Sequence, residues 1–371
     1  MMEAYLDASA TTPVDPRVKE AMDAVEYANP SSLHAKGQEA REAVERSRIA
    51  LAKALDCRPA EIFFTSGGTE SVNWALKGVR AKHIITTKIE HHAVLETCEH
   101  LRNEGAEVTY VPVGKDGVVN PEDIKNAITP LTRLISVIYV NNELGTIQPI
   151  REIGEIAKKH NILFHVDACQ AGLLDLDVKR LQCDLLTLNA SKLGGPKGVG
   201  LLYVRFGVKL TPLLHGGGQE RGMRSGTENV PAIVGFAKAV EIIQSSKEQE
   251  TMKLFALQTR LEEGLKRLGG RINCESSPRV PSITSVTFKG VEAESLLLQL
   301  SDKGVYVSTG SACATKSLEP SHVLKALGFS DSEAHGTLRF SLSWQNTAEE
   351  VAYTLKCVKE VLDNLRAAVA R

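Results

Sequence analysis

Strand, turn and helix follow one another in the stretch Ile62-Phe63-Phe64-Thr65-Ser66-Gly67-Gly68-Thr69-Glu70. The apolar run predicts a buried strand, and the paired glycines predict a tight turn. The residues that follow have the i, i+3, i+4, i+7 spacing of an amphipathic helix, with apolar side chains at Val72, Ala75, Leu76 and Val79. A strand that leads into a helix in this way is the unit from which α/β folds are built.

The same alternation continues to about residue 205 and predicts the rest of the sheet. The expected strands are Ile62 to Thr65, His83 to Thr87, Glu107 to Pro112, Leu134 to Val140, Ile162 to Val166, Leu185 to Leu188 and Gly200 to Val204. Strands that alternate with helices predict a mostly parallel sheet covered on both faces. Ligands bind such sheets at the carboxyl ends of the strands, so the functional site is expected in the loops after them.

Beyond residue 230 the pattern changes and predicts a second unit. A helix-like stretch, Ala232 to Ile243, is followed by the polar segment Ser245 to Glu250, which we interpret as a boundary. Later expected elements are strands, a helix and a terminal helix with a Thr347/Glu350 capping box, namely Ser282 to Phe288, Ala293 to Leu300, Thr337 to Leu342 and the stretch from Thr347 onward. We expect a large α/β domain over residues 14–250 and a smaller α+β domain over residues 1–13 and 251–371.

Composition argues against several classes of function. The 371 residues carry 44 Lys and Arg against 45 Asp and Glu, a net charge of −1, so a general basic surface for nucleic acid is not expected. No apolar run approaches the ~18 residues of a membrane span, and the first residues do not form an export signal. Seven scattered cysteines without a C-x-x-C pair predict no zinc site and favour a reducing, cytoplasmic location. We expect no nucleic-acid partner, no membrane partner and no metal.

The turn from Ser66 to Thr69 is suited to hold an anion. Glycines let successive backbone N–H groups point outward, and the N-terminus of the next helix adds partial positive charge. The turn matches neither the P-loop nor the G-x-G-x-x-G dinucleotide pattern. A plain connection between strand and helix is the alternative.

A carboxylate and a lysine follow two of the other expected strands. Asp167 lies just past the apolar run Ile162-Leu163-Phe164, where its carboxylate needs a cationic or N–H partner unless it caps a helix. Lys192 lies 25 residues further on (192 − 167), between a strand and a Gly/Pro turn. Burial there predicts a lowered pKa and a nucleophilic amine.

Pyridoxal 5'-phosphate would use all of these groups at once. This cofactor needs an anion cradle for its phosphate, a lysine for its aldehyde, a carboxylate for its pyridinium nitrogen and a flat group over its ring. Gly68 and Thr69, Lys192 and Asp167 can supply the first three. His91, which follows another expected strand, can supply the fourth and also act as an acid or base. We therefore predict pyridoxal phosphate as the cofactor.

The chain resembles the cysteine desulfurases, a branch of the class V aminotransferase group of pyridoxal-phosphate enzymes, nearly from end to end. The most specific segments are Ser66-Gly67-Gly68-Thr69-Glu70, Val140-Asn141-Asn142-Glu143-Leu144-Gly145, His165-Val166-Asp167-Ala168-Cys169-Gln170, residues 215–227 and Ser311-Ala312-Cys313. The resemblance implies the fold type I of these transferases. In that fold, a large domain with a mostly parallel seven-stranded sheet is joined to a smaller α+β C-terminal domain that carries the catalytic cysteine loop.

The resemblance also implies a role for each matching residue around the cofactor. Lys192 would bond its aldehyde and later move the substrate Cα proton, Asp167 would keep its ring nitrogen protonated, and His91 would stack on its ring. The phosphate would be held by Gly68, Thr69, Asn189 and Ser191, with Thr227 reaching the phosphate of the neighbouring subunit in a homodimer with shared active sites.

The substrate contacts implied by the resemblance involve fewer residues. Asn142 and Gln170 would lie near the substrate carboxylate and the ring oxygen of the cofactor. Arg339 would clamp the carboxylate, a task that suits a planar, bidentate cation.

Cys313 lies in a run of small and polar residues, 308–317, with little apolar surface to pack. Such a run favours a mobile loop that carries a nucleophile over a structural cysteine. By resemblance, the Cys313 thiolate would attack the sulfur of L-cysteine, keep it as a persulfide and release L-alanine. The sulfur would then pass to an acceptor protein such as an iron–sulfur scaffold.

Other functions remain open at this stage. A selenocysteine lyase or another class V aminotransferase would share most of these residues. A catalytically silent assembly scaffold would share the fold. The family usually has Ser, His and an aromatic residue where this chain has Asn189, Ser191 and Gly194, and these departures are the feature that favours the scaffold.

Overall fold

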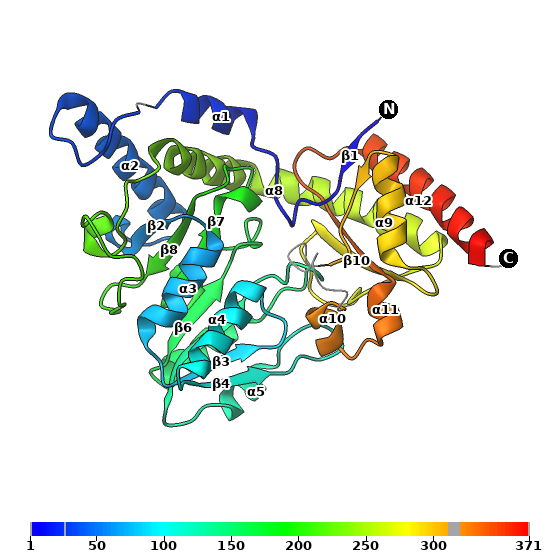
Figure 1. Cartoon of the computed structure of the whole chain (residues 1–371), viewed down its shortest axis with the longest axis horizontal. Coiled ribbons are helices and arrows are strands. Elements are labelled where there is room, and N and C mark those ends of the chain that lie inside the picture. Colours follow the sequence, from blue (N-terminus) through cyan, green and yellow to red (C-terminus); the bar gives the residue numbers. More distant parts are fainter. Residues whose placement is uncertain (1, 26, 311–319, 370–371) are drawn as a thin grey trace.

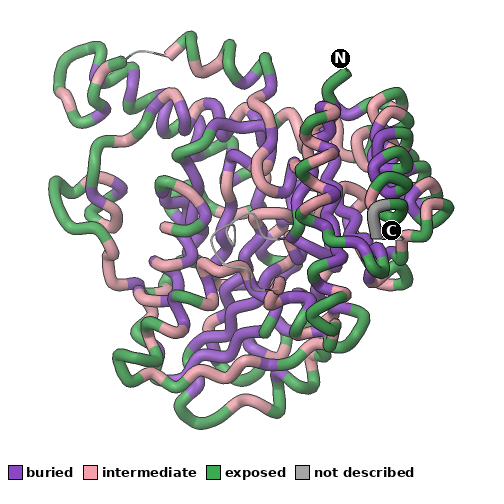
Figure 2. Tube along the Cα trace, turned by 45° about the vertical axis from the view of Figure 1, so that its right-hand side comes forward, coloured by how far each residue is buried: buried purple, intermediate pink, exposed green. Residues whose placement is uncertain are grey.

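A computed structural model describes residues 2–25, 27–310 and 320–369. Figure 1 shows a large α/β body and, beside it, a smaller unit formed by the last third of the chain together with the N-terminal strand. In Figure 2 the buried stretches of the trace run through the middle of each part, and the exposed stretches lie mainly at the outer loops and helix surfaces.

The large body is built on a seven-stranded, mostly parallel sheet, and the predicted fold class is confirmed. Its strands, in order across the sheet, are β2 (Ile62–Thr65), β8 (Gly200–Val204), β7 (Leu185–Asn189), β6 (Leu163–Asp167), β5 (Thr132–Ile138), β3 (His83–Thr87) and β4 (Glu107–Val111). β8 is antiparallel to both of its neighbours, β2 and β7, and the other pairs are parallel. The remaining strands therefore run in one direction, and their carboxyl ends share one edge of the sheet.

Helices cover both faces of this sheet, which explains why its strands are apolar on both sides. α3 (Gly68–Val79) and α4 (His92–Asn103) pack on the face that includes Ile84 and Leu134. The neighbouring residues Ile85 and Ile135 point to the opposite face. The helices on that face are α2 (Ala35–Ala54), α5 (Pro121–Asn126), α6 (Ile150–Lys159), α7 (Val178–Leu181) and the first half of α8, with α1 (Pro16–Asp23) packed along α8.

β5 covers Thr132–Ile138 rather than the predicted Leu134 to Val140. Tyr139 N still donates to the Asp167 carbonyl of β6, and the chain then leaves the sheet because Val140 pairs with Ile147 across a turn. Val140 is nevertheless fully buried, so its apolar side chain extends the sequence pattern past the end of the strand.

The smaller unit has its own hydrophobic core. Its strands and helices are β1 (Ala4–Tyr5), β9 (Gly270–Ile272), β10 (Ile283–Phe288), α9 (Ala293–Asp302), β11 (Val305–Tyr306), α10 (His322–Ala326), α11 (Asp331–His335), β12 (Thr337–Ser341) and α12 (Ala348–Val369). β1 pairs with β11, and the core joins Ala4 and Leu6 to residues from Leu254 onward. The reciprocal hydrogen bonds between Thr347 and Glu350 form the predicted capping box at the start of α12.

The predicted helix end near Ile243 is wrong, because α8 runs without a break over Val230–Arg267. The polar segment from Ser245 to Glu250 contains no glycine or proline, and the two serine hydroxyls donate to the Ile242 carbonyl inside the helix. Polarity there reflects a mostly exposed helical stretch rather than a break. α8 contributes its first half to one core and its second half to the other, and the proposed domain division near residue 250 stays a prediction.

Within the described part of the chain, the helices are all too short or too polar to cross a lipid bilayer.

Candidate active site

A cavity of about 280 Å³ opens at the edge of the sheet where the strands end. Its lining includes most of the predicted site residues, namely Gly68, Thr69, His91, Asn142, Asp167, Gln170, Asn189, Ser191, Lys192 and Arg339. They come from the ends of β2, β3, β5, β6 and β7 and from β12 of the smaller unit. The sheet topology thus gathers side chains that are far apart in the sequence.

α3 begins at the rim of this cavity without a capping side chain. Its N-cap residue is Gly67, whose φ of +152° favours glycine, and the next two residues line the cavity. A Cβ on Gly68 would lie 2.9 Å from Sγ of Cys169, so a larger residue would close the space. The N-terminus of α3 is therefore open to an anion.

Asp167 is the last residue of β6 and is almost completely buried. Its Oδ1 accepts a hydrogen bond from the Cys169 backbone N–H at 3.0 Å. Burial and the neighbouring Asp167 carboxylate raise the pKa of the Cys169 thiol well above its ordinary value. The Cys169 thiol therefore stays protonated at neutral pH.

His91 is the N-cap of α4, and its Nδ1 accepts from the Ala93 backbone N–H at 3.0 Å. This bond places the ring proton of the neutral form on Nε2. Burial lowers the pKa of His91, helped by the nearby Lys192 and opposed by Asp167. The cavity therefore contains a flat, neutral imidazole that can donate a proton through Nε2.

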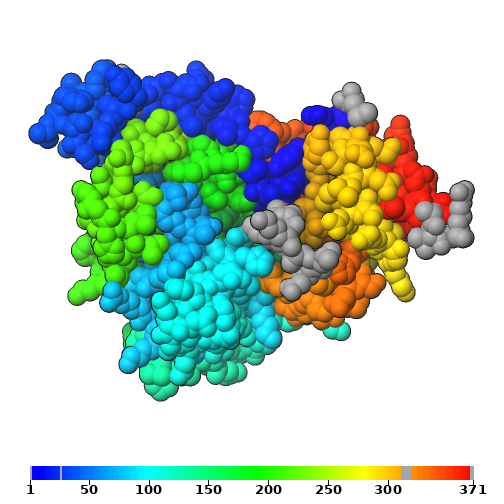
Figure 3. All heavy atoms as spheres, in the orientation of Figure 1, coloured from blue at the N-terminus to red at the C-terminus, as the bar shows by residue number. Residues whose placement is uncertain are grey.

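Lys192 ends the short 3-10 turn Ala190–Lys192 that follows β7. Its Nζ donates to the Ser9 carbonyl at 2.7 Å and to the Ala10 carbonyl. Gln170 donates to the same Ser9 carbonyl at 2.9 Å. Figure 3 shows the first residues of the chain lying between the large body and the smaller unit. The N-terminal segment thus holds the lysine amine at the junction of the two cores.

Asn142 and Arg339 meet through the main chain. Arg339 donates to the Asn142 carbonyl at 3.0 Å and to Oδ1 of Asp7 at 2.7 Å. Its Nε is buried and finds no hydrogen-bond partner among the described residues. The guanidinium is therefore fixed in the cavity wall by Asp7 but keeps unused hydrogen-bonding capacity.

The family model for "Aminotransferase class-V" matches residues 4–353. The chain belongs to the class-V aminotransferase family. A cysteine desulfurase IscS of Methanosarcina thermophila is 51% identical, over 98% of this chain and 92% of the relative.

Two solved structures extend the comparison. A "NifS-like protein" has a TM-score of 0.93 at 43% identity and covers 98% of this chain and 100% of its own. "SspA in complex with cysteine" has a TM-score of 0.83 at 39% identity and covers 91% of this chain and 98% of its own. These likenesses confirm the resemblance to cysteine desulfurases seen in the sequence.

Enzymes of the class-V family use pyridoxal phosphate, and the cavity of this member fits it. The open N-terminus of α3 suits a phosphate, and the narrow space beside Gly68 excludes a side chain there. Lys192, Asp167 and His91 provide an amine, a carboxylate and a neutral ring around one volume. These are the groups that the aldehyde, the ring nitrogen and the ring face of the cofactor require.

The resemblance set Asn189, Ser191 and Gly194 apart as departures, and the structure shows a local role for two of them. The Asn189 side chain accepts from Ser191 N at 3.4 Å and caps the 3-10 turn that carries Lys192. Gly194 has a φ of +71°, and a Cβ there would lie 3.4 Å from Nε1 of Trp344. Asn189 thus supports the lysine turn, and glycine suits the backbone where Trp344 already lies.

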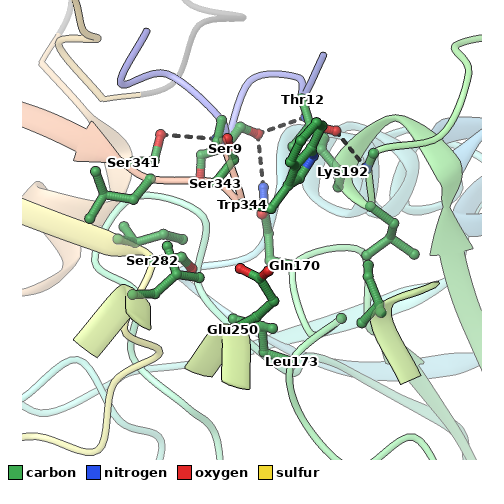
Figure 4. Close-up of a pocket in the computed structure, with 18 residues that line it drawn as sticks. Ser9, Thr12, Gln170, Leu173, Lys192, Glu250, Ser282, Ser341, Ser343 and Trp344 are labelled. Atoms are coloured by element: carbon green, nitrogen blue, oxygen red, sulfur yellow. Dashed lines mark hydrogen bonds between the residues drawn. The ribbon is translucent and has the colours of Figure 1, made fainter. Parts of the chain in front are cut away.

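A second cavity, of about 90 Å³, lies against Lys192 and is drawn in Figure 4. Ser9, Gln170 and Lys192 line both cavities and form the wall between them. Glu250 and Trp344 lie on the other sides of this space. Lys192 therefore lies beside both cavities.

Two predicted site residues are not part of the described lining. Thr227 is exposed on a surface segment, and Cys313 lies outside the described residues. Residues on both sides of 311–319 contact Glu143, which follows Asn142. The Ser321 hydroxyl donates to Glu143 at 2.5 Å, and a Cβ on Gly310 would lie 3.1 Å from the same carboxylate oxygen.

Sequence reasoning missed Ser9, Ala10 and Cys169 as lining residues. The signal available for the first two was the run of small residues before the first helix, which carries no chemistry of its own. For metal binding, the residues that the structure describes contain no group of three or more His, Cys, Asp or Glu side chains arranged as ligands.

Glu90, which precedes His91, gives a prediction about pH. Burial raises the pKa of its carboxyl from 4.5 to about 8, although the hydrogen bond that the Thr87 hydroxyl donates to it acts to lower the pKa. Between these two values the folded protein keeps a proton that the unfolded chain has lost. Stability contributed by this group is therefore complete below about pH 4.5 and is lost as the pH rises to about 8. We expect the melting temperature of Glu90→Gln, measured in thermal scans, to fall less than that of the wild type between pH 5 and 8. Melting temperatures that fall in parallel with pH in both proteins would contradict this prediction.

Proposed function

We propose that this protein is a cysteine desulfurase that takes the sulfur of L-cysteine onto Cys313, releases L-alanine and passes the sulfur to an acceptor protein. One observation carries the proposal. Lys192, Asp167 and His91 line a single cavity together with an open helix N-terminus. The same cavity lies in a chain that matches cysteine desulfurases over 98% of its length.

In the proposed reaction each residue has one task. Pyridoxal phosphate, when bound, supplies an electron sink for the pair released at the substrate Cα. Lys192 removes the Cα proton with its Nζ, and Asp167 keeps a proton on the ring nitrogen. The neutral imidazole of His91 would cover the ring of the bound cofactor and could donate its Nε2 proton, because Nδ1 accepts from the Ala93 N–H. Arg339 and Asn142 lie where they can bind the carboxylate of the substrate.

Sulfur transfer is balanced without an added oxidant. The Cys313 thiolate forms a bond to the substrate sulfur, and the Cβ–S bond of the substrate breaks. The electron pair of that bond stays on Cβ, which takes a proton and becomes the methyl group of alanine. The second sulfur remains on Cys313 as a persulfide, so one thiol and one cysteine become one persulfide and one alanine.

The finer partner assignments are also proposals. We infer a homodimer with shared sites, in which the exposed Thr227 reaches the phosphate site of the neighbouring subunit. We infer an iron–sulfur scaffold as the sulfur acceptor, since the IscS and NifS-like relatives are the most similar proteins reported above. The unpaired cysteines of the described chain suit a reducing compartment, and we propose the cytoplasm.

The test supplies purified protein with L-cysteine and a reductant, and measures sulfide and alanine together. We expect both products in a 1:1 ratio from the wild type, and a loss of sulfide release of at least about 100-fold in Cys313→Ala. Cys169→Ala is the matched control. It removes a thiol from the cofactor cavity whose raised pKa keeps it protonated, and it should retain sulfide release within about threefold.

The outcomes separate the alternatives. Full turnover of an amino donor by Cys313→Ala would favour another class V aminotransferase. A much higher turnover rate with selenocysteine than with cysteine would favour a selenocysteine lyase. A wild type that yields neither product and takes up no cofactor would favour a silent scaffold.

A further inference from the structure

One surface segment is fastened at two points to the strand and helix that form the anion cradle. This brace segment comprises residues 219–225 and includes the 3-10 turn Glu220–Gly222. Glu220 pairs with Arg48 at 2.7 Å, and Arg224 pairs with Glu70 at 2.7 Å. The first pair holds β2, and the second holds the first turn of α3.

The Glu220–Arg48 pair explains why the brace segment is held rigidly. β2 is an edge strand, so its outward-facing backbone groups lack a neighbouring strand. Glu220 accepts from the Phe64 N–H at 2.8 Å, and Arg48 donates to the Ile62 carbonyl at 2.8 Å. Both side chains are more than nine-tenths buried. They take the place of the missing strand and fix the backbone that carries Arg224.

The Arg224–Glu70 pair lies at the N-terminus of α3. Glu70 is in the first helical turn, directly after the cavity-lining residues Gly68 and Thr69. Its carboxylate accepts from the Ser66 N–H at 2.8 Å and from two nitrogens of Arg224 at 2.7 and 3.0 Å. Burial raises the pKa of Glu70, but the hydrogen bonds from Arg224 and Ser66 outweigh it and leave the pKa below the ordinary value. The carboxylate is therefore ionised.

An ionised carboxylate at this position is a problem for a phosphate site. The partial positive charge of a helix N-terminus stabilises a nearby anion, and the Glu70 carboxylate already lies in that first turn. A phosphate dianion bound by the same first turn would be repelled by the carboxylate within a few ångströms. The half-buried guanidinium of Arg224 supplies the counter-charge that removes this conflict.

We propose that Arg224 is a positioning residue for phosphate binding, which neutralises Glu70 and so leaves the N-terminus of α3 available to a phosphate dianion. The inference rests on the proposed function only in taking the dianion to be the phosphate of pyridoxal phosphate. It assigns Arg224 no contact with that phosphate.

The test compares pyridoxal phosphate with unphosphorylated pyridoxal, because an electrostatic role affects only the charged ligand. Dissociation constants are measured by absorbance for the full-length chain after removal of bound cofactor. We expect Arg224→Gln to raise the dissociation constant of pyridoxal phosphate by about 10-fold or more. The dissociation constant of pyridoxal should stay within about twofold of the wild-type value. Glu70→Gln should bind pyridoxal phosphate at least as tightly as the wild type, and the double variant should lie within about threefold of the wild type.

Two further variants make the result unambiguous. Arg224→Lys keeps the positive charge but loses the paired donors of the guanidinium, and it should retain the affinity for pyridoxal phosphate within about threefold. This variant also keeps the proposal testable if Arg224→Gln does not fold. Arg279→Gln breaks a comparably buried pair with Glu262 in the smaller unit, and it should leave the ratio of the two affinities unchanged.

The proposal is overturned if Arg224→Gln weakens both ligands equally, if Glu70→Gln does not rescue it, or if Arg224→Lys loses phosphate affinity like Arg224→Gln. Each of these results would mean that the pair acts only as a structural brace. The test measures ligand affinity and does not involve sulfide. If the protein bound the cofactor but did not desulfurate cysteine, the proposed function would be contradicted, while the affinities could still be measured and compared.

Discussion

Replacing Lys192 with alanine is expected to abolish the release of sulfide and alanine from L-cysteine. In the proposed reaction this amine would bond the cofactor aldehyde and later move the Cα proton, and no other described lining residue carries a primary amine. We expect a fall in turnover of at least about 10⁴-fold, or about 5.4 kcal/mol at 1.36 kcal/mol per tenfold. Borohydride reduction should label residue 192 in the wild type and leave the variant unlabelled.

Lys197→Ala is the matched control for this prediction. Lys197 is exposed just beyond the Gly/Pro turn and does not line the cavity. Its removal should change turnover by less than about twofold. Substantial sulfide release from a folded Lys192→Ala protein, as judged by thermal unfolding, would mean that another group performs both tasks and would contradict the assignment.

Replacing Asp167 with asparagine is the second change with a large expected effect. The amide keeps the shape and can still accept from the Cys169 N–H, but it carries no charge to hold a proton on a ring nitrogen. We expect turnover to fall by about 10³-fold, or about 4 kcal/mol, with cofactor binding weakened less. In the same variant the ring nitrogen of the bound cofactor should lose its proton at a lower pH, and the change should be visible in the cofactor's absorbance.

Asp184→Asn separates this electronic role from a structural one. Asp184 lies next to the amino end of β7, at the opposite edge of the sheet, where it pairs with Arg205 and accepts from Phe164 N. Its loss should lower the melting temperature without changing the absorbance titration. An Asp167→Asn variant that keeps the wild-type titration and loses only stability would rule out the proposed role.

The parts of the fold that depend on local patterns were accessible from the sequence. β2, β3 and β8 coincide with the predicted strands, because each is a short apolar run between turn residues. α8 was misjudged because a run of polar residues signals solvent exposure, and exposure does not end a helix that lacks glycine and proline.

The candidate site likewise contains residues that local patterns could predict and contacts that depend on the tertiary structure. Gly68, Asp167 and Lys192 could be predicted because each lies at or just past the end of a strand, and parallel topology brings strand ends together. The contact of Ser9 with Lys192 could not, since it joins residues 183 positions apart through a backbone carbonyl that any residue type provides. The Asp7–Arg339 pair is similar, because both charges were visible in the sequence but their pairing depends on how β12 lies beside the N-terminal segment.

The position of β1 has a consequence for how the nascent chain matures. Asp7 bridges Ser341, which lies 334 positions later in the chain (341 − 7), and a stretch of that length takes on the order of tens of seconds to synthesise at about 5–20 residues per second. During translation the large α/β body can form while its first residues still lack their neighbours in β11 and β12. The segment that holds the lysine amine thus leaves the ribosome well before β11 and β12, and it is among the last to find its place. A bulky fusion placed directly before β1 would therefore interfere with the closing step of folding rather than with its start.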